Sequence, residues 1–266
     1  MSIQITTEQV KELRDATGVS VMQCKRALEE ALGDMKKALA ILKKTSSDIA
    51  LKKINRAVKD GAVMIKIKDL PTGQAGKKAV LVSLHCETDF VSRNEDFTTV
   101  LKNLGDIVLK DGIEKMKKEA KDMINTIIQK TGENIQLGDV YEVSGDVLGS
   151  YVHNNKSGVI VSLIGGNTEL AKDIAMHITA MKPEYITSEE ITPDTRKMIL
   201  EIFQKELAGI NKPEEIKKKM LDGKISAYFK EKTLLDQPFI KNPQESIGGL
   251  LEKSKAKIKE VKRYSI

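Results

Sequence analysis

The sequence predicts an α+β protein with an N-terminal bundle of three helices, a core of two related α+β subdomains and an inserted antiparallel helical hairpin. Three observations lead to this class. Helix caps and glycines divide residues 1–44 into three segments, a strand sequence at residue 80 recurs at residue 159, and two apolar stripes follow each other over 193–230. A chain of 266 residues with 40% hydrophobic residues is long and apolar enough to bury such a core.

Residues 1–44 carry the start and stop signals of three helices. Thr6 and Ser20 each precede a glutamine by three positions, which is the pattern of a capping box. Gly18 and Gly33 are placed to end the first two helices, because glycine adopts the left-handed conformation after a helix without steric cost. The aspartate after the second glycine can then cap the third helix.

Strand and helix patterns alternate from residue 62 to residue 181. Runs rich in β-branched residues, or alternating in polarity, predict strands, and apolar residues at helical spacing predict helices. We expect a turn at 70–74 between the first two strands. The expected strands are 62–68, 78–86, 136–143, 147–153 and 158–164, and the expected helices are 93–110, 113–131 and 168–181.

An internal repeat relates the two halves of this region. The sequence Val-Leu-Val-Ser-Leu at 80–84 matches Val-Ile-Val-Ser-Leu at 159–163. With one residue of offset, Thr88-Asp89-Phe90 parallels Thr168-Glu169-Leu170, and each triplet precedes an expected helix. The shared order of strand, turn and helix predicts two related subdomains.

The segment 193–230 predicts two antiparallel helices joined by a break at 209–213. Two apolar stripes are expected to bury against each other. The first stripe consists of Ile199, Ile202, Phe203 and Leu207, and the second of Ile216, Met220, Ile225 and Tyr228. A short helix around 247–251 and a strand near 258–264 should complete the second subdomain.

These elements define four expected units. A basic helix over about 47–60 should link the bundle to the core. The units are the bundle with its linker helix at 1–54, the first core subdomain at 55–146, the second at 147–188 with 232–266, and the hairpin at 189–231.

The chain is basic, and its excess charge is uneven. Its net charge is +6, and between residues 34 and 60 eight basic residues stand against three acidic ones. This basic stripe could contact phosphates or an acidic protein face, or it could be an ordinary solvated helix surface. Nucleic-acid binding proteins often add aromatic stacking platforms, which this stretch lacks. The basic residues are Lys36, Lys37, Lys43, Lys44, Lys52, Lys53, Arg56 and Lys59.

Most sequence signatures of catalysis are absent. The chain has no phosphate-binding Gly-x-x-x-x-Gly-Lys loop, no nucleophile elbow and no dinucleotide fingerprint. His85 and Cys86 are adjacent on an expected strand, so their side chains should point to opposite faces. Two cysteines and three dispersed histidines are too few for a disulfide framework or a cysteine-rich metal site. We therefore expect a non-enzymatic protein without cofactor or metal.

The length of the apolar runs and the N-terminal sequence indicate in which cellular compartment the protein is expected. The apolar runs are too short to span a membrane. Residues 1–5 lead directly into a helix pattern, without the basic and apolar regions of a secretory signal. The expected location is the cytoplasm.

Two segments are candidates for contact with a partner. Val21 and Met22 open a helix close to Arg14, where apolar side chains either staple the bundle or protrude toward another protein. The segment Thr88-Asp89-Phe90-Val91 leaves a strand and enters a helix. Here Thr88 or Asp89 could cap the helix while Phe90 packs inward, yet the repeat carries no aromatic residue at the equivalent site.

Six segments along the chain resemble the elongation factor Ts family. Leu13–Leu28 resembles the first signature of that family, and Thr88–Val91 is identical to the second. The further matching segments are Gly145–His153, Ala175–Ile178, Lys182–Ile186 and Gln237–Phe239. The resemblance covers nearly the whole chain.

This resemblance implies a fold, a partner and roles for individual residues. It implies a ubiquitin-associated-like N-terminal bundle and a translational GTPase partner, elongation factor Tu, whose GDP is released, with no direct binding of nucleic acid and no membrane. Arg14, Val21 and Met22 would contact a helix of the partner's G domain, although Val21 replaces the methionine common in the family. The residues implied to wedge beside the magnesium and phosphate site are Thr88, Asp89, Phe90 and Val91. His153 in the second subdomain would hold another partner domain.

Two other classes of protein remain open from the residues. An RNA-binding protein could use the basic stripe, and its affinity would then fall steeply with salt. A scaffold protein could use the helical hairpin, and it would bind a partner without changing nucleotide release.

Overall fold

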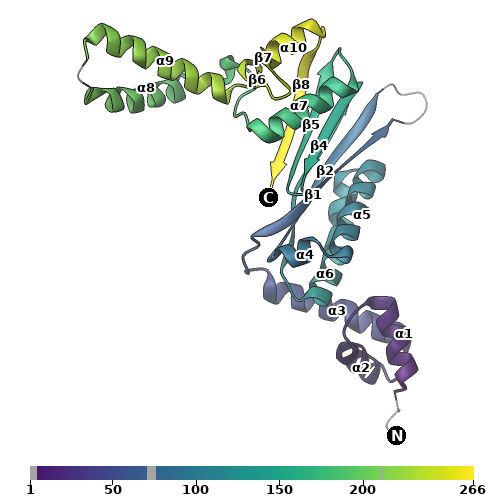
Figure 1. Cartoon of the computed structure of the whole chain (residues 1–266). Helices are drawn as coiled ribbons and strands as arrows, with labels where there is room; N and C mark the ends of the chain where they lie inside the picture. The colour runs from purple at the N-terminus through teal and green to yellow at the C-terminus, as the bar shows by residue number, and fades with distance from the viewer. Residues whose placement is uncertain (1–4, 71–75, 211) are drawn as a thin grey trace.

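The computed structural model describes residues 5–70, 76–210 and 212–266. A three-helix bundle lies at one end, two sheets with their helices lie in the middle, and a helical hairpin projects from the other end (Figure 1). Of the turn predicted at 70–74, residues 71–74 lie outside the described residues, as does residue 211 in the hairpin break.

The bundle consists of α1 (Thr7–Thr17), α2 (Val21–Glu30) and α3 (Met35–Lys53). The capping box at Thr6 is confirmed, because the Gln9 N–H donates to Thr6 Oγ1 at 3.2 Å and the Thr6 N–H donates to Gln9 Oε1 at 3.1 Å. Ser20 caps α2 by accepting from the Gln23 N–H, but Gln23 Oε1 makes no return bond, so the second predicted capping box forms only in half. The buried side chains of Leu13, Cys24, Leu28 and Leu42 form part of the bundle's own core.

The prediction of a separate linker helix over 47–60 is wrong. Helix α3 runs without a break to Lys53 and ends there. Thr45 and Ser46 do not interrupt it, because their hydroxyls donate to the carbonyls of Ile41 at 2.9 Å and Lys43 at 2.7 Å within the same helix. The first half of α3 therefore packs in the bundle, while Ile49 and Ala50 in its second half pack against the core of the first sheet.

Two three-stranded antiparallel sheets form the centre of the molecule. The first has the order β1-β2-β3, from Asp60–Asp69, Lys77–Cys86 and Ile135–Gly145. The second has the order β4-β5-β8, from Val147–His153, Ser157–Ile164 and Lys257–Ser265. The repeated sequence lies in β2 and β5, which are the central strands of their sheets. The predicted strands and the internal repeat are thus confirmed.

Helices cover the outer face of each sheet, and the inner faces pack together. The first sheet carries α4 (Asp89–Ser92), α5 (Glu95–Asp111) and α6 (Ile113–Thr131), and the second carries α7 (Thr168–Met181) and α10 (Ile247–Lys253). Between the sheets lies a cluster that includes Val63 and Leu81 from the first and Leu148 and Ile160 from the second. The two subdomains therefore form one stack of four layers.

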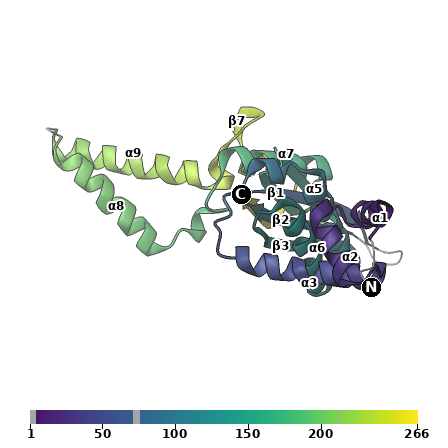
Figure 2. The ribbon, with the colours of Figure 1, turned by 90° about the horizontal axis from the view of Figure 1, so that it is seen from below.

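The hairpin consists of α8 (Pro193–Ala208) and α9 (Glu214–Lys232), and Figure 2 shows it projecting away from both sheets. Its apolar cluster forms around Ile191, Ile199 and Phe229. Ile202 and Ile216, predicted to face the opposite helix, are exposed instead. Aromatic rings occupy the interface, since Phe203 and Tyr228 pack edge to face with centroids 5.8 Å apart.

Short elements connect the hairpin to the second sheet. The chain enters and leaves the hairpin side by side, because the N–H groups of Glu184 and Tyr185 donate to the Lys232 carbonyl at 2.9 and 3.1 Å. The connecting elements are the 3₁₀ turns Ser188–Glu190 and Leu234–Asp236 and the strands β6 (Pro238–Phe239) and β7 (Asn242–Ser246).

Candidate partner-binding surface

The segment Thr88–Val91 leaves the central strand β2 and forms the single helical turn α4. Thr88 occupies the N-cap position with an extended backbone, but its hydroxyl donates to Glu133 Oε1 at 2.6 Å rather than capping the helix. The Asp89 carboxylate pairs with Arg93 Nη2 at 3.1 Å. The alternative in which the side chain of Thr88 or Asp89 caps this helix is therefore wrong.

Phe90 projects outward from this turn. Its side chain is 84% exposed, whereas that of the following Val91 is buried in the core of the first sheet. In the repeat, the equivalent Leu170 is only 9% exposed and packs in the second core. The interpretation of Phe90 as a core residue is therefore wrong. At this position the first repeat has an exposed side chain and the second repeat has a buried one.

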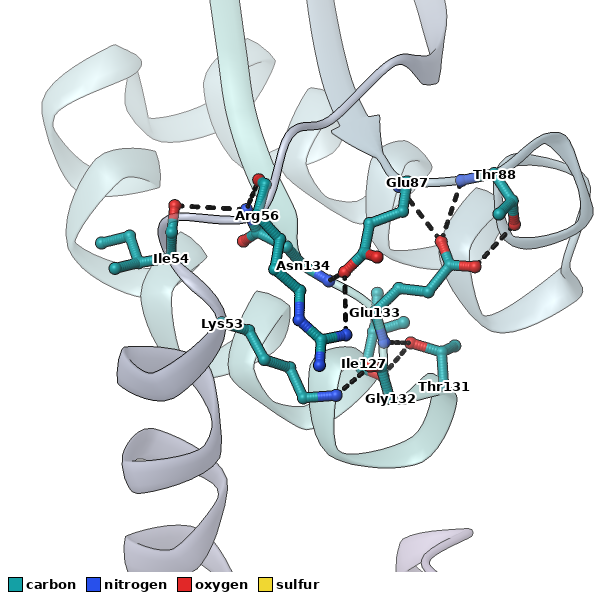
Figure 3. Close-up of polar contacts among 10 residues, drawn as sticks. All are labelled: Lys53, Ile54, Arg56, Glu87, Thr88, Ile127, Thr131, Gly132, Glu133 and Asn134. Atoms are coloured by element: carbon teal, nitrogen blue, oxygen red, sulfur yellow. Dashed lines mark hydrogen bonds and ion pairs between the residues drawn. The ribbon is translucent and has the colours of Figure 1, made fainter.

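Glu133, in the loop between α6 and β3, holds the start of this segment (Figure 3). Its Oε2 accepts from the N–H groups of Glu87 and Thr88 at 3.1 and 3.0 Å. The Glu87 carboxylate in turn accepts from the Asn134 N–H at 2.6 Å and pairs with Arg56 at 3.5 Å. The two loops are thus joined by two carboxylates, each of which accepts from backbone N–H groups of the other loop.

The same loop also holds the chain that leaves the bundle. The Asn134 side-chain amide donates to the carbonyls of Ile54 at 3.3 Å and Arg56 at 2.7 Å, and Lys53 Nζ donates to the Gly132 carbonyl (Figure 3). The end of α3 and the segment that carries Phe90 are therefore anchored to one short connection.

Lys156 joins α4 to the second sheet. This lysine lies in the turn between β4 and β5, and its Nζ reaches Asp60 Oδ1 at 2.5 Å, the Gly61 carbonyl at 2.6 Å and Ser92 Oγ at 3.1 Å. Burial alone would raise the pKa of Asp60, but the hydrogen bond from Lys156 and those from Ser92 and Gly61 outweigh it and lower the pKa. His153 lies exposed at the end of β4, directly before this turn, and its carbonyl accepts from the Lys156 N–H at 2.9 Å.

The predicted contact residues of the bundle are exposed. Val21 and Met22 are 51% and 59% exposed in the first turn of α2, and Arg14 is exposed on α1. Val10, Arg14 and Val21 line a shallow groove between the two helices. The turn that follows His153 contacts α4 through the bond from Lys156 to Ser92, next to Thr88–Val91, whereas Arg14, Val21 and Met22 lie on α1 and α2 of the bundle.

Sequence reasoning missed the three residues that position this surface, namely Glu133, Asn134 and Lys156. Each acts on residues distant in the chain, so no local period or motif singles it out. One local feature could have drawn attention to Glu133 and Asn134. They are the two residues between Gly132, which ends α6 with a φ of 76°, and the start of β3.

The surface offers little covalent or metal chemistry. Burial, followed by the nearby carboxylates of Asp60 and Glu133, raises the pKa of the Cys86 thiol to about 12, so the nucleophilic thiolate is scarce at neutral pH. His85 points the other way, toward the Tyr264 hydroxyl at 2.6 Å. Over residues 5–70, 76–210 and 212–266 there is no cluster of three or more potential metal ligands. None of the helices in these ranges has the length and apolar character needed to cross a bilayer.

Several residues of the basic stripe make intramolecular contacts. Lys43 pairs with Asp122 at 2.6 Å, Lys53 binds the Gly132 carbonyl and Arg56 pairs with Glu87. These cations fasten α3 and its exit to the core, which reduces the charge that remains for an outside phosphate.

Comparisons with known proteins agree with this fold. A family model described as Elongation factor TS matches residues 87–266. Elongation factor Ts of Hahella chejuensis is 39% identical over 98% of this chain and 92% of its own length. The proteins of the same name from Nitrosospira multiformis and Thioalkalivibrio sulfidiphilus are each 36% identical, over 99% and 98% of this chain and 90% and 92% of their own lengths.

Proposed function

The chain belongs to the elongation factor Ts family of translation elongation factors, and from this premise we propose that it is a guanine-nucleotide exchange factor for elongation factor Tu. It binds the GDP form of that GTPase in the cytoplasm and promotes GDP release by disturbing the site that holds Mg²⁺ and the phosphates. It is not an enzyme, because exchange breaks and forms no covalent bond.

The observation that carries this proposal is the exposure of Phe90 on an anchored turn. At 84%, Phe90 is the most exposed of the large hydrophobic side chains in the described part of the chain, and an aromatic ring held out to water can bury a large apolar surface against a partner. Burial of roughly 150 Å² of its surface at about 25 cal/mol per Å² could contribute about 4 kcal/mol at most to a complex. Part of that free energy would be used to deform the partner.

Linkage explains how binding becomes exchange. A protein that binds the nucleotide-free GTPase more tightly than the GDP form must weaken GDP binding by the same factor. Mg²⁺ neutralises phosphate charge, so a small displacement near it has a large effect on GDP affinity. Thr88, Asp89, Phe90 and Val91 would act at that site, while Arg14, Val21 and Met22 dock the bundle on the G domain and His153 contacts another domain.

The test is the release of a fluorescent GDP analogue from elongation factor Tu. The intact chain should accelerate release, and Phe90→Ala should slow the accelerated rate by about tenfold or more, because about 1.4 kcal/mol of lost transition-state contact corresponds to a factor of ten. Ile164→Ala is the matched control, since Ile164 is an exposed aliphatic residue at the far end of β5. Unchanged release with the intact chain would overturn the proposal and favour a scaffold.

A further inference from the structure

Three hydrogen-bond donors from two consecutive residues converge on one carboxylate. Glu133 Oε2 accepts from the N–H groups of Glu87 and Thr88, and Oε1 accepts from the Thr88 hydroxyl at 2.6 Å. These residues directly precede Asp89 and Phe90. We propose that Glu133 is a positioning residue for nucleotide exchange, which fixes the direction in which α4 presents Phe90 to the GTPase. This inference rests on the proposed function.

The turn that carries Phe90 needs such support. Helix α4 has four residues, which is no more than the costly nucleus of a helix, so its own hydrogen bonds cannot keep it formed in water. Neither Thr88 nor Asp89 caps it with a side chain. Hydrogen bonds to a charged carboxylate are shorter and roughly twice as strong as neutral ones. Glu133 thus supplies, from another part of the chain, the anchor that the turn lacks.

Glu133 is itself held in place. Its N–H donates to Thr131 Oγ1 at 3.3 Å, and the next residue, Asn134, is 2% exposed. Asn134 binds Glu87 through its backbone and the end of the bundle linker through its side chain (Figure 3). A group that is locked on both sides can orient its neighbours within a narrow range, as an effective binding site requires.

This geometry separates docking from exchange. The Glu133 carboxylate accepts hydrogen bonds from Glu87 and Thr88, so its loss removes no contact of the exposed bundle residues on α1 and α2. The orientation of Phe90 does depend on it. Glu133→Ala should therefore reduce the maximal rate of GDP release much more than it changes the concentration that gives half of that rate.

The experiment is a double-mutant cycle on the full chain with elongation factor Tu loaded with fluorescent GDP. Glu133→Ala should slow maximal release about tenfold, and the double variant with Phe90→Ala should release GDP no more slowly than Phe90→Ala alone. Glu133→Gln should stay within about twofold of the intact chain, because its amide oxygen can accept from both N–H groups while its NH₂ donates to Thr88 Oγ1. Glu114→Ala removes an exposed carboxylate of α6 as the control.

Each other outcome decides the question. If Glu133→Ala slows GDP release by the same factor in the Phe90→Ala variant as in the intact chain, the positioning role is overturned. It is also overturned if Glu133→Gln releases GDP as slowly as Glu133→Ala. Slow release by Phe90→Ala with normal release by Glu133→Ala would overturn this inference alone, whereas normal release by Phe90→Ala would overturn the proposed function and this inference with it. If a thermal melt shows that Glu133→Ala is unfolded, Thr88→Val, which deletes only the hydroxyl bond, replaces it in the cycle and should slow release about threefold.

Discussion

Phe90 and Phe97 lie seven residues apart and differ completely in environment, because Phe97 on α5 is fully buried in the core of the first sheet whereas Phe90 faces water. Phe97→Ala should lower the free energy of unfolding by about 3–5 kcal/mol through lost transfer and a cavity. Phe90→Ala should change it by less than about 1 kcal/mol. Urea denaturation of both variants measures this contrast. Comparable losses for the two would mean that Phe90 packs inside the folded protein.

His177 is a buried histidine that should make stability depend on pH. Its Nδ1 accepts from the Ile240 N–H at 3.3 Å, so its Nε2 carries the proton and donates to Gln237 Oε1 at 2.9 Å. Burial lowers the pKa of His177, and the hydrogen bond with Gln237 offsets only part of this effect. The folded protein therefore binds this proton less readily than the unfolded chain, whose histidines titrate near pH 6.5.

The sign of the pH effect follows from proton linkage. Above about pH 6.5 the stabilisation by neutral His177 is complete, and it is lost as the pH falls from there toward the lowered pKa of the folded state. The free energy of unfolding should decline between about pH 7 and pH 5, and His177→Gln should flatten that decline. Chemical denaturation across this range measures it. The exposed His153→Gln is the control and should keep the slope; an equal slope in His177→Gln would refute the prediction.

At the scale of elements, the hairpin should be separable from the core. Its apolar cluster around Ile199 and Phe229 is distinct from the core of the second sheet, and its two ends meet where Tyr185 bridges to Thr233. Replacement of residues 193–230 by a short glycine-rich linker should leave the two sheets cooperatively folded. Near-UV circular dichroism and a thermal melt test this. Loss of the near-UV signal would show that the hairpin is an integral part of the core.

Element boundaries were predictable where a single residue decides them. Gly18 and Gly132 both end helices with positive φ, and Asp34 caps α3 through two backbone N–H groups. The prediction that a new helix begins near residue 47 was wrong. Hydroxyl residues such as Thr45 favour helix ends in general, but their side chains can also donate to a carbonyl of the same helix without ending it. The prediction of the hairpin interface was wrong in part. Apolar periodicity does not tell which of two adjacent apolar residues faces the partner helix, and here Phe203 does so while Ile202 is exposed.

At the scale of the whole molecule, the two sheets should unfold together. Leu81 and Ile160 are fully buried between them, in strands that belong to different halves of the chain. Leu81→Ala should lower the free energy of unfolding by about 2–5 kcal/mol and weaken hydrogen-exchange protection equally in β2 and β5. Ile164→Ala, at an exposed position, should change neither. Weaker protection in β2 alone would mean that the halves unfold separately.

The stacking of the sheets shows where sequence reasoning stops. The repeat predicted two related halves, because strand and helix patterns are local. It did not predict that their inner faces meet, since strand sequences buried on both faces are equally compatible with other covering elements. The roles of Glu133 and Lys156 were hidden for the same reason. Their partners, Thr88 and Asp60, lie tens of residues away in the sequence and become neighbours only after the fold has formed.

The two cysteines give the molecule built-in reporters of local opening. Cys24 is buried in the core of the bundle and Cys86 in the core of the first sheet, and the sequence contains no others. A thiol reagent can modify each one only after the surrounding structure opens. The labelling rates of the two peptides, resolved by mass spectrometry, would therefore report the opening of the bundle and of the first sheet separately in the unmodified chain.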